Sequence, residues 1–312
     1  MTMYMAIRNP QSAVRNAAGW FFGTLTGIAS LIVVTMVVII LGNIVVNGAG
    51  RISWQFLTRT PEMGMTEGGI FPAIFGTFSL VVLMTLVVVP MGVATALYMH
   101  EYAPKRSRLV KVVRLAIQNL AGVPAIVFGL FGLGFFIQFI GRGMDQGLYG
   151  GDLHYGQPAI IWAALTMALL TLPTVVVASE EALRAIPQSY REAAYAMGAT
   201  RWQVIRRVVL PQAVGGILTG AILAVSRGAG EVAPVMFTGA AYFLPYLPTR
   251  LNDQFMELGY HVYVMTTQSP NVEETKPILY ATVLVLLLLT FSLNFTAIMI
   301  RARIRSRLRA GR

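Results

Sequence analysis

The chain has 312 residues, of which 56% are hydrophobic and 12% are charged, and its formal net charge is +11. Soluble domains carry about 25% charged residues, so this composition excludes an ordinary soluble domain and indicates a membrane protein. The absence of cysteine excludes disulfides and thiolate metal sites, and the three histidines lie far apart and form no HExxH-type metal site.

Six apolar segments are long enough to cross the hydrocarbon core of a bilayer, which takes about 20 residues. The first is too long for the apolar part of a signal peptide and lacks a convincing cleavage site, so it is expected to remain as a helix. The expected fold is an all-α polytopic membrane protein whose single transmembrane domain covers residues 1–312. The segments are 16–50, about 70–99, about 115–139, about 158–178, a fifth that begins after Pro211, and about 277–300.

Lysine and arginine are concentrated at one set of segment ends. They cluster near the N-terminus, in 105–114, in 184–207 and in 301–312. The bias of basic residues toward cytoplasmic loops places both termini and the 189–211 loop in the cytoplasm. It also explains the net charge without nucleic acid, and the basic C-terminal run is expected to contact anionic lipid headgroups.

The cytoplasmic loop Ser189–Pro211 carries signals for two short helices. Ser189 with Glu192, and Thr200 with Gln203, have the spacing of capping boxes. Gly198 stands where the first helix would stop, and Pro211 is expected to close the second. A structured helix pair between two membrane segments predicts a docking surface.

Two charges, Arg227 and Glu231, stand inside the apolar run after Pro211. A helix that enters the membrane near Ala213 would place Arg227 about 21 Å along its axis. Residues four apart share a helix face, so the two are expected to pair. One alternative is a purely structural salt bridge, and another is a helix that ends at Ser226 with both charges at the outer interface. The functional reading is an anion path, in which Arg227 offers a fork of donors to an oxyanion and Glu231 holds it in place.

The chain carries no signal for binding ATP. A Walker A loop needs Gly-Lys, and the lysines follow Pro104, Val110 and Thr275. No cofactor is therefore expected in this chain, and a pump would need a partner that hydrolyses the nucleotide.

The cytoplasmic loop resembles the EAA loop of the permease subunits of type I ABC importers. The resemblance rests on Glu192-Ala193-Ala194-x3-Gly198 and, nine residues later, Val208-Val-Leu210-Pro211, with Val208 where the family usually has Ile. It implies a permease core at 70–302 and a coupling helix that inserts into a cleft of an ATPase subunit. The residues implied in coupling are Glu192, Ala193, Ala194, Gly198, Leu210 and Pro211.

Four further stretches are similar to the PstA family of phosphate permeases. They begin at Glu67-Gly-Gly-Ile, Glu101-Tyr-Ala-Pro, Asn119-Leu-Ala-Gly and Ser226-Arg-Gly-Ala-Gly-Glu, and Val232 and Ala125 depart from the usual Thr and Ser. The resemblance implies a multi-pass subunit of the bacterial cytoplasmic membrane. Its implied partners are a second permease (PstC-like), an ATPase dimer that holds ATP and magnesium (PstB-like), and a periplasmic phosphate-binding protein (PstS-like).

The same resemblance implies a substrate pathway with Arg227, Glu231 and Arg184. Arg184 matches a similar position of the family. Three roles remain open for it: binding the anion, contacting the ATPase, or stabilising the local structure. The alternatives to phosphate are sulfate, molybdate and phosphonate. A proton-coupled secondary transporter that uses Glu231 as a relay, and a scaffold without transport, are the rivals from other classes.

Overall fold

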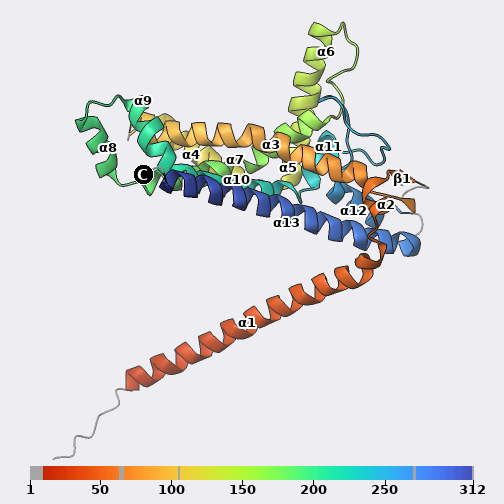
Figure 1. The fold of residues 1–312 in the computed structure, drawn as a ribbon, viewed down its shortest axis with the longest axis horizontal. Coiled ribbons are helices and arrows are strands. Elements are labelled where there is room, and N and C mark those ends of the chain that lie inside the picture. Colours follow the sequence, from red (N-terminus) through yellow and green to blue (C-terminus); the bar gives the residue numbers. More distant parts are fainter. Residues whose placement is uncertain (1–9, 63–66, 105, 270–271, 311–312) are drawn as a thin grey trace, which may run out of the picture.

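The computed structural model describes residues 10–62, 67–104, 106–269 and 272–310. In this part of the chain, six helical segments are long and apolar enough to cross a membrane, which confirms the all-α, six-span prediction. They are Gly19–Arg51, Phe71–Tyr102, Ala125–Leu148, Ile160–Arg184, Arg201–Gly228 and Thr275–Arg307. Long helices form a bundle, and the first helix, α1 (Pro10–Gly48), diverges from it (Figure 1).

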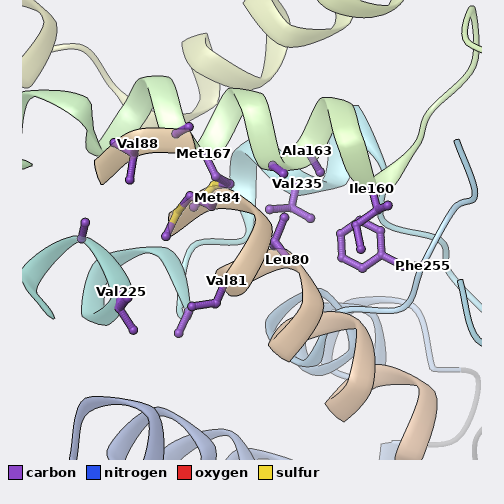
Figure 2. Close-up of a cluster of buried hydrophobic side chains, with 14 of the residues drawn as sticks. Leu80, Val81, Met84, Val88, Ile160, Ala163, Met167, Val225, Val235 and Phe255 are labelled. Atoms are coloured by element: carbon purple, nitrogen blue, oxygen red, sulfur yellow. The ribbon is translucent and has the colours of Figure 1, made fainter. Parts of the chain in front are cut away.

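The bundle is built on three helices, α3 (Phe71–Leu97), α7 (Ile160–Arg184) and α10 (Leu210–Gly228). Their apolar side chains interdigitate in the main core, where Met84 of α3 meets Met167 of α7 (Figure 2). Small residues let α7 and α10 approach closely, because a Cβ on Gly216 would lie 2.3 Å from the Cβ of Ala182. This rigid core supports the charged residues described below.

The other elements connect and flank this core, with the coupling segments at one end and a small β-hairpin at the other (Figure 1). Strands β1 and β2 pair antiparallel, with Pro61 opposite Gly68. The elements are η1 (Ala49–Arg51), α2 (Trp54–Thr58), β1 (Pro61–Glu62), β2 (Glu67–Gly68), η3 (Tyr98–Tyr102), α4 (Arg108–Ala121), α5 (Ala125–Phe131), η4 (Gly132–Gly141), α6 (Arg142–Leu148), α8 (Gln188–Ala196), α9 (Arg201–Val204), η5 (Ile205–Val209), α11 (Ala233–Thr238), α12 (Leu258–Thr267) and α13 (Val272–Ala310).

The third membrane segment differs from its predicted range of 115–139. Helix α4 ends at Ala121, and the third span runs from Ala125 to Leu148. Pro124 separates the two with an extended ψ of 140°. Proline has no N–H and its ring clashes with a preceding helical turn, so the chain breaks here and a new helix starts. The apolar residues at 115–121 belong to a separate helix at the cytoplasmic end.

Helix α13 lies along α10 and is held to it by two polar contacts. The Asn294 side chain lies 2.6 Å from the Ser226 hydroxyl, and Arg301 donates to the Thr219 hydroxyl at 2.8 Å. In an apolar setting, interhelical hydrogen bonds fix the register of neighbouring helices. The pair at Ser226 therefore fixes the end of α10 next to Arg227.

Helix α3 packs closely against the segment before α12 at Gly76, and substitution of this glycine tests that packing. A Cβ at this position would lie 2.0 Å from the Met256 carbonyl oxygen, a backbone atom that cannot move away alone. We expect Gly76→Ala to destabilise the chain by about 1–3 kcal/mol, measured as a lower thermal unfolding midpoint of the purified protein. Gly134→Ala is the control, since its Cβ would meet nothing within 4 Å. Equal midpoints for the two variants would contradict this packing.

Candidate functional site

The first helix of the cytoplasmic loop, α8 (Gln188–Ala196), starts two residues earlier than the predicted capping box requires. Pro187 is the N-cap, with ψ of 139°, and Gln188 is the first helical residue. Ser189 therefore lies inside the first turn, where its side chain no longer faces the free N–H groups. The Ser189–Glu192 capping box is wrong, because the fixed φ of Pro187 already sets the start of the helix.

The second capping box and the stop at Gly198 are confirmed. The Gln203 N–H donates to the Thr200 hydroxyl, and the Thr200 N–H donates to the Gln203 side chain at 2.8 Å. Gly198 has φ of +79°, and the N–H of Ala199 returns to the Ala194 carbonyl at 3.1 Å. A glycine in the left-handed region ends α8 and reverses the chain toward α9.

The prediction that Pro211 closes the second helix is wrong. The segment Arg201–Gly228 is one continuous helix of 28 residues. The π-helical turn η5 (Ile205–Val209) stands directly before Leu210 and Pro211. Its wider turn accommodates the missing N–H and the ring of the proline, so the helix continues. Leu210 and Pro211 thus belong to the fifth span, and the cytoplasmic loop is joined to it by continuous helix.

A buried ion pair fixes α8 to the rest of the molecule. The Arg191 guanidinium donates to the Glu101 carboxylate at 2.8 Å, and to the carbonyls of Ile186 and Leu183 at 2.8 and 3.0 Å. The two charged side chains are 7% and 9% exposed. The pair joins α8 to the ends of α3 and α7. Sequence reasoning missed it, because the partners are 90 residues apart and no local pattern links them.

The opposite side of the cytoplasmic loop faces outward. Of the predicted coupling residues, Glu192, Ala193 and Gly198 are exposed and Ala194 is half-buried. Large side chains accompany them, and Met197 is 88% exposed. The others are Tyr190, Tyr195 and Trp202. Such a surface at the end of a rigid helix is suited to inserting into a groove of another protein.

Arg227 and Glu231 form the predicted pair, although the helix between them does not continue. Helix α10 ends at Gly228, and the chain turns before α11 begins at Ala233. The Arg227 Nε donates to the Glu231 carboxylate at 3.2 Å, and the two side chains are 40% and 24% exposed. The expectation of one helix face carrying both is therefore wrong, since the turn after Gly228 brings Glu231 back to Arg227.

The pair lies at the level of the middle of the bundle. A Cβ on Gly228 would lie 2.6 Å from the sulfur of Met84, the middle residue of α3. A position at the outer interface does not fit this level. An exposed guanidinium on the flank of an apolar bundle, halfway along its helices, is costly in lipid, so this face is suited to an aqueous path or a partner.

Arg184 belongs to a different place. It stands at the cytoplasmic end of α7, where it donates to Glu180 at 3.2 Å. Helix α7 runs antiparallel to α10, and its residue near Gly228 is Met167. Seventeen residues of helix separate the levels of Met167 and Arg184, or roughly 25 Å. The structure brings Arg227 and Glu231 together and leaves Arg184 with the coupling loop.

Gly198 provides a direct test of the loop geometry. Its added Cβ would meet nothing within 4 Å, so the cost of Gly198→Val is in the backbone, at about 1–2 kcal/mol for a left-handed residue. We expect α8 to be displaced, with loss of ATPase co-purification and normal membrane insertion. Gly215→Ala, which also meets open space but lies within α10, is the control and should retain the ATPase. Retained ATPase in Gly198→Val would contradict docking by this loop.

Comparison with known proteins places most of the chain, residues 88–309, in one family. The model of the "Binding-protein-dependent transport system inner membrane component" matches residues 88–309. The probable ABC transporter permease YqgI of Bacillus subtilis is 33% identical, over 68% of this chain and 67% of its own length. The phosphate transport system permease PstA of Haemophilus influenzae is 32% identical, over 72% of this chain and 73% of its own length.

Solved structures agree on the fold. A permease chain of a bacterial ABC transporter for the polysaccharide alginate superposes with a TM-score of 0.64, at 16% identity, over 95% of this chain and 99% of that chain. A chain of the methionine transporter MetNI superposes with a TM-score of 0.53, at 18% identity, over 76% of this chain and 94% of that chain. Members of the matched family are non-catalytic membrane subunits of importers. The chain therefore belongs to the binding-protein-dependent transport system inner membrane components, as a multi-pass ABC importer permease of the inner membrane.

Proposed function

We propose that this permease is a subunit of an ATP-driven importer for inorganic phosphate. The observation that carries the proposal is the exposed Arg227–Glu231 pair at mid-bundle level. Relatives that are named phosphate permeases support it, including PstA 1 of Mycobacterium tuberculosis, 36% identical over 59% of this chain and 54% of its own length. The chain would form the path together with a homologous second permease (PstC-like), which covers the face that carries Arg227.

The energy for transport enters through α8. An ATPase dimer (PstB-like) holds ATP and magnesium and receives α8 in a groove. A periplasmic binding protein (PstS-like) delivers the anion at the opposite end. Structures with the same fold support such an assembly, since one is described as an alginate transporter in complex with a substrate-bound periplasmic protein.

The chemistry of the pair favours phosphate over a fully deprotonated oxyanion. The planar guanidinium of Arg227 offers two parallel donors to a tetrahedral anion. The Glu231 carboxylate is an acceptor, and it would receive a hydrogen bond from a protonated phosphate oxygen. Sulfate has no such proton near neutral pH and would meet repulsion from the carboxylate. Glu231 also competes with the anion for Arg227, and this competition keeps the affinity for the anion low enough for its release.

Reconstitution tests the assignment. The complete complex in vesicles should hydrolyse ATP faster with binding protein and phosphate than with binding protein alone. Stimulation by sulfate, molybdate or phosphonate instead of phosphate would favour the second candidate, a permease for another oxyanion. Two relatives, YqgI and YqgH of Bacillus subtilis, carry no substrate in their names, so this arm is needed. Uptake driven by a proton gradient without ATP would contradict both.

A further inference from the structure

A second basic site lies at the cytoplasmic end of the bundle, far from Arg227. A cavity of about 800 Å³ opens between the ends of α3 and α7, helix α4 and the coupling helix α8. Cavities that hold small ligands have volumes of about 300–1,000 Å³. The proposed anion path through Arg227 does not include this cavity, although the Arg191–Glu101 pair that holds α8 forms part of its lining.

Arginine outnumbers carboxylate around the cavity. Among the described lining residues, four arginines face two glutamates, which leaves two positive charges in excess. The arginines are Arg114, Arg184, Arg191 and Arg201, and the glutamates are Glu101 and Glu180. An excess of guanidinium groups around a concave site raises the local concentration of anions.

The ion pairs show which arginines are committed. Arg191 is fully used, because it is buried against Glu101 and two backbone carbonyls. Glu180 is shared by two partners, Arg114 and Arg184, so one carboxylate serves two guanidiniums. Each of these two retains N–H groups that Glu180 does not accept.

Two further donors lack an acceptor. Within the described part of the chain, the buried Nε of Arg114 has no hydrogen-bond partner. The guanidinium of Arg201 lies 4.9 Å over the ring of Tyr102 and forms no ion pair with a described carboxylate. Stacking on a ring uses the flat face of the guanidinium and leaves its in-plane N–H groups free. A donor that is buried without an acceptor is costly, and a bound anion would satisfy it.

We propose that this cavity binds a phosphate group on the cytoplasmic side, held by Arg114, Arg184 and Arg201. Guanidinium forks match the oxygens of a phosphate group, and the excess positive charge attracts either the dianion of inorganic phosphate or the monoanionic phosphodiester of a lipid. The group therefore has two sources that share these phosphate oxygens, free inorganic phosphate and the headgroup of a phospholipid in the inner leaflet. A lipid headgroup would occupy this cavity regardless of which solute the complex transports. The proposal therefore does not depend on the proposed import of phosphate.

Binding to the full chain in lipid nanodiscs tests the proposal. All proteins carry Arg227→Gln, so that the mid-bundle arginine does not contribute. In nanodiscs of phosphatidylcholine, inorganic phosphate is titrated by calorimetry. In nanodiscs with phosphatidylglycerol, retained lipid is counted by native mass spectrometry. The test variant adds Arg184→Gln and Arg201→Gln, whose side chains are exposed, so that the fold should persist.

The control variant removes two exposed arginines outside the cavity, Arg108→Gln and Arg206→Gln, and has the same net charge as the test variant. We expect the test variant to weaken phosphate binding, or to lose the retained phosphatidylglycerol, at least about tenfold relative to the control. The titration arm identifies free phosphate and the lipid arm identifies a headgroup. Equal phosphate affinity and equal retention of phosphatidylglycerol in the two variants would overturn the proposal. This holds even if the test variant alone failed to bind an ATPase subunit. Neither result depends on transport, so failure here leaves the proposed function standing.

Discussion

Arg227→Gln is expected to reduce phosphate uptake by the assembled complex at least about 100-fold. The amide keeps the size of the side chain but loses the charge and the fork. Hydrogen bonds to charged groups contribute about 1.5–3 kcal/mol each, and loss of two of them gives this factor. The measurement is radiolabelled phosphate uptake into vesicles that contain the whole complex.

The control for this variant is an arginine of the third span, whereas Arg227 lies in the fifth. Arg142→Gln lies on α6, outside the proposed path, and should leave uptake within about twofold of the parent, since substitutions away from a site have small effects. Co-purification of all subunits must be retained in both variants. Normal uptake by Arg227→Gln would assign the Arg227–Glu231 pair a structural role and would remove the main support for an anion path.

Arg191→Met is expected to have the second large effect, through the coupling helix. The substitution removes the guanidinium from the Glu101 carboxylate, which keeps only the contact with His100 Nδ1 at 3.0 Å, and from the carbonyls of Ile186 and Leu183. Breaking a buried ion pair on one side costs about 3–5 kcal/mol. We expect a lower thermal unfolding midpoint and a loss of ATPase co-purification, because α8 is no longer held against α3 and α7.

A double-mutant cycle separates this pair from a general loss of charge. Glu101→Gln alone should also destabilise the chain, and the double variant with Arg191→Met should be less destabilised than the sum of the single variants. Arg206→Met, on the exposed side of η5, serves as the control and should bind the ATPase normally. Additive effects of the two substitutions would show that the buried contact does not hold α8.

The sequence was sufficient for features that depend on local chemistry. Span number follows from the length of apolar runs, and the Thr200–Gln203 box and the turn at Gly198 follow from side chains and φ preferences within a few residues. All three features were predicted and all three are present.

Features that depend on competing or distant contacts were not predictable in this way. Pro187 outcompetes Ser189 as the start of α8, and a π-helical turn lets Pro211 stay inside a helix. The Arg191–Glu101 contact needs the tertiary fold, since it joins residues 90 positions apart. For the same reason the sequence could not separate Arg184 from Arg227, although the fold places them at different levels.

The uninterrupted helix Arg201–Gly228 makes the subunit a lever. Its 28 residues span about 40 Å, with the loop that we propose docks on the ATPase at one end and Arg227 at the other. A tilt of only about 10° about one end would sweep the other end through roughly 7 Å, a distance comparable to the diameter of a hydrated small anion. The helix has no break in its backbone between these ends. A displacement of α8 is therefore expected to move the Arg227 guanidinium at the same time.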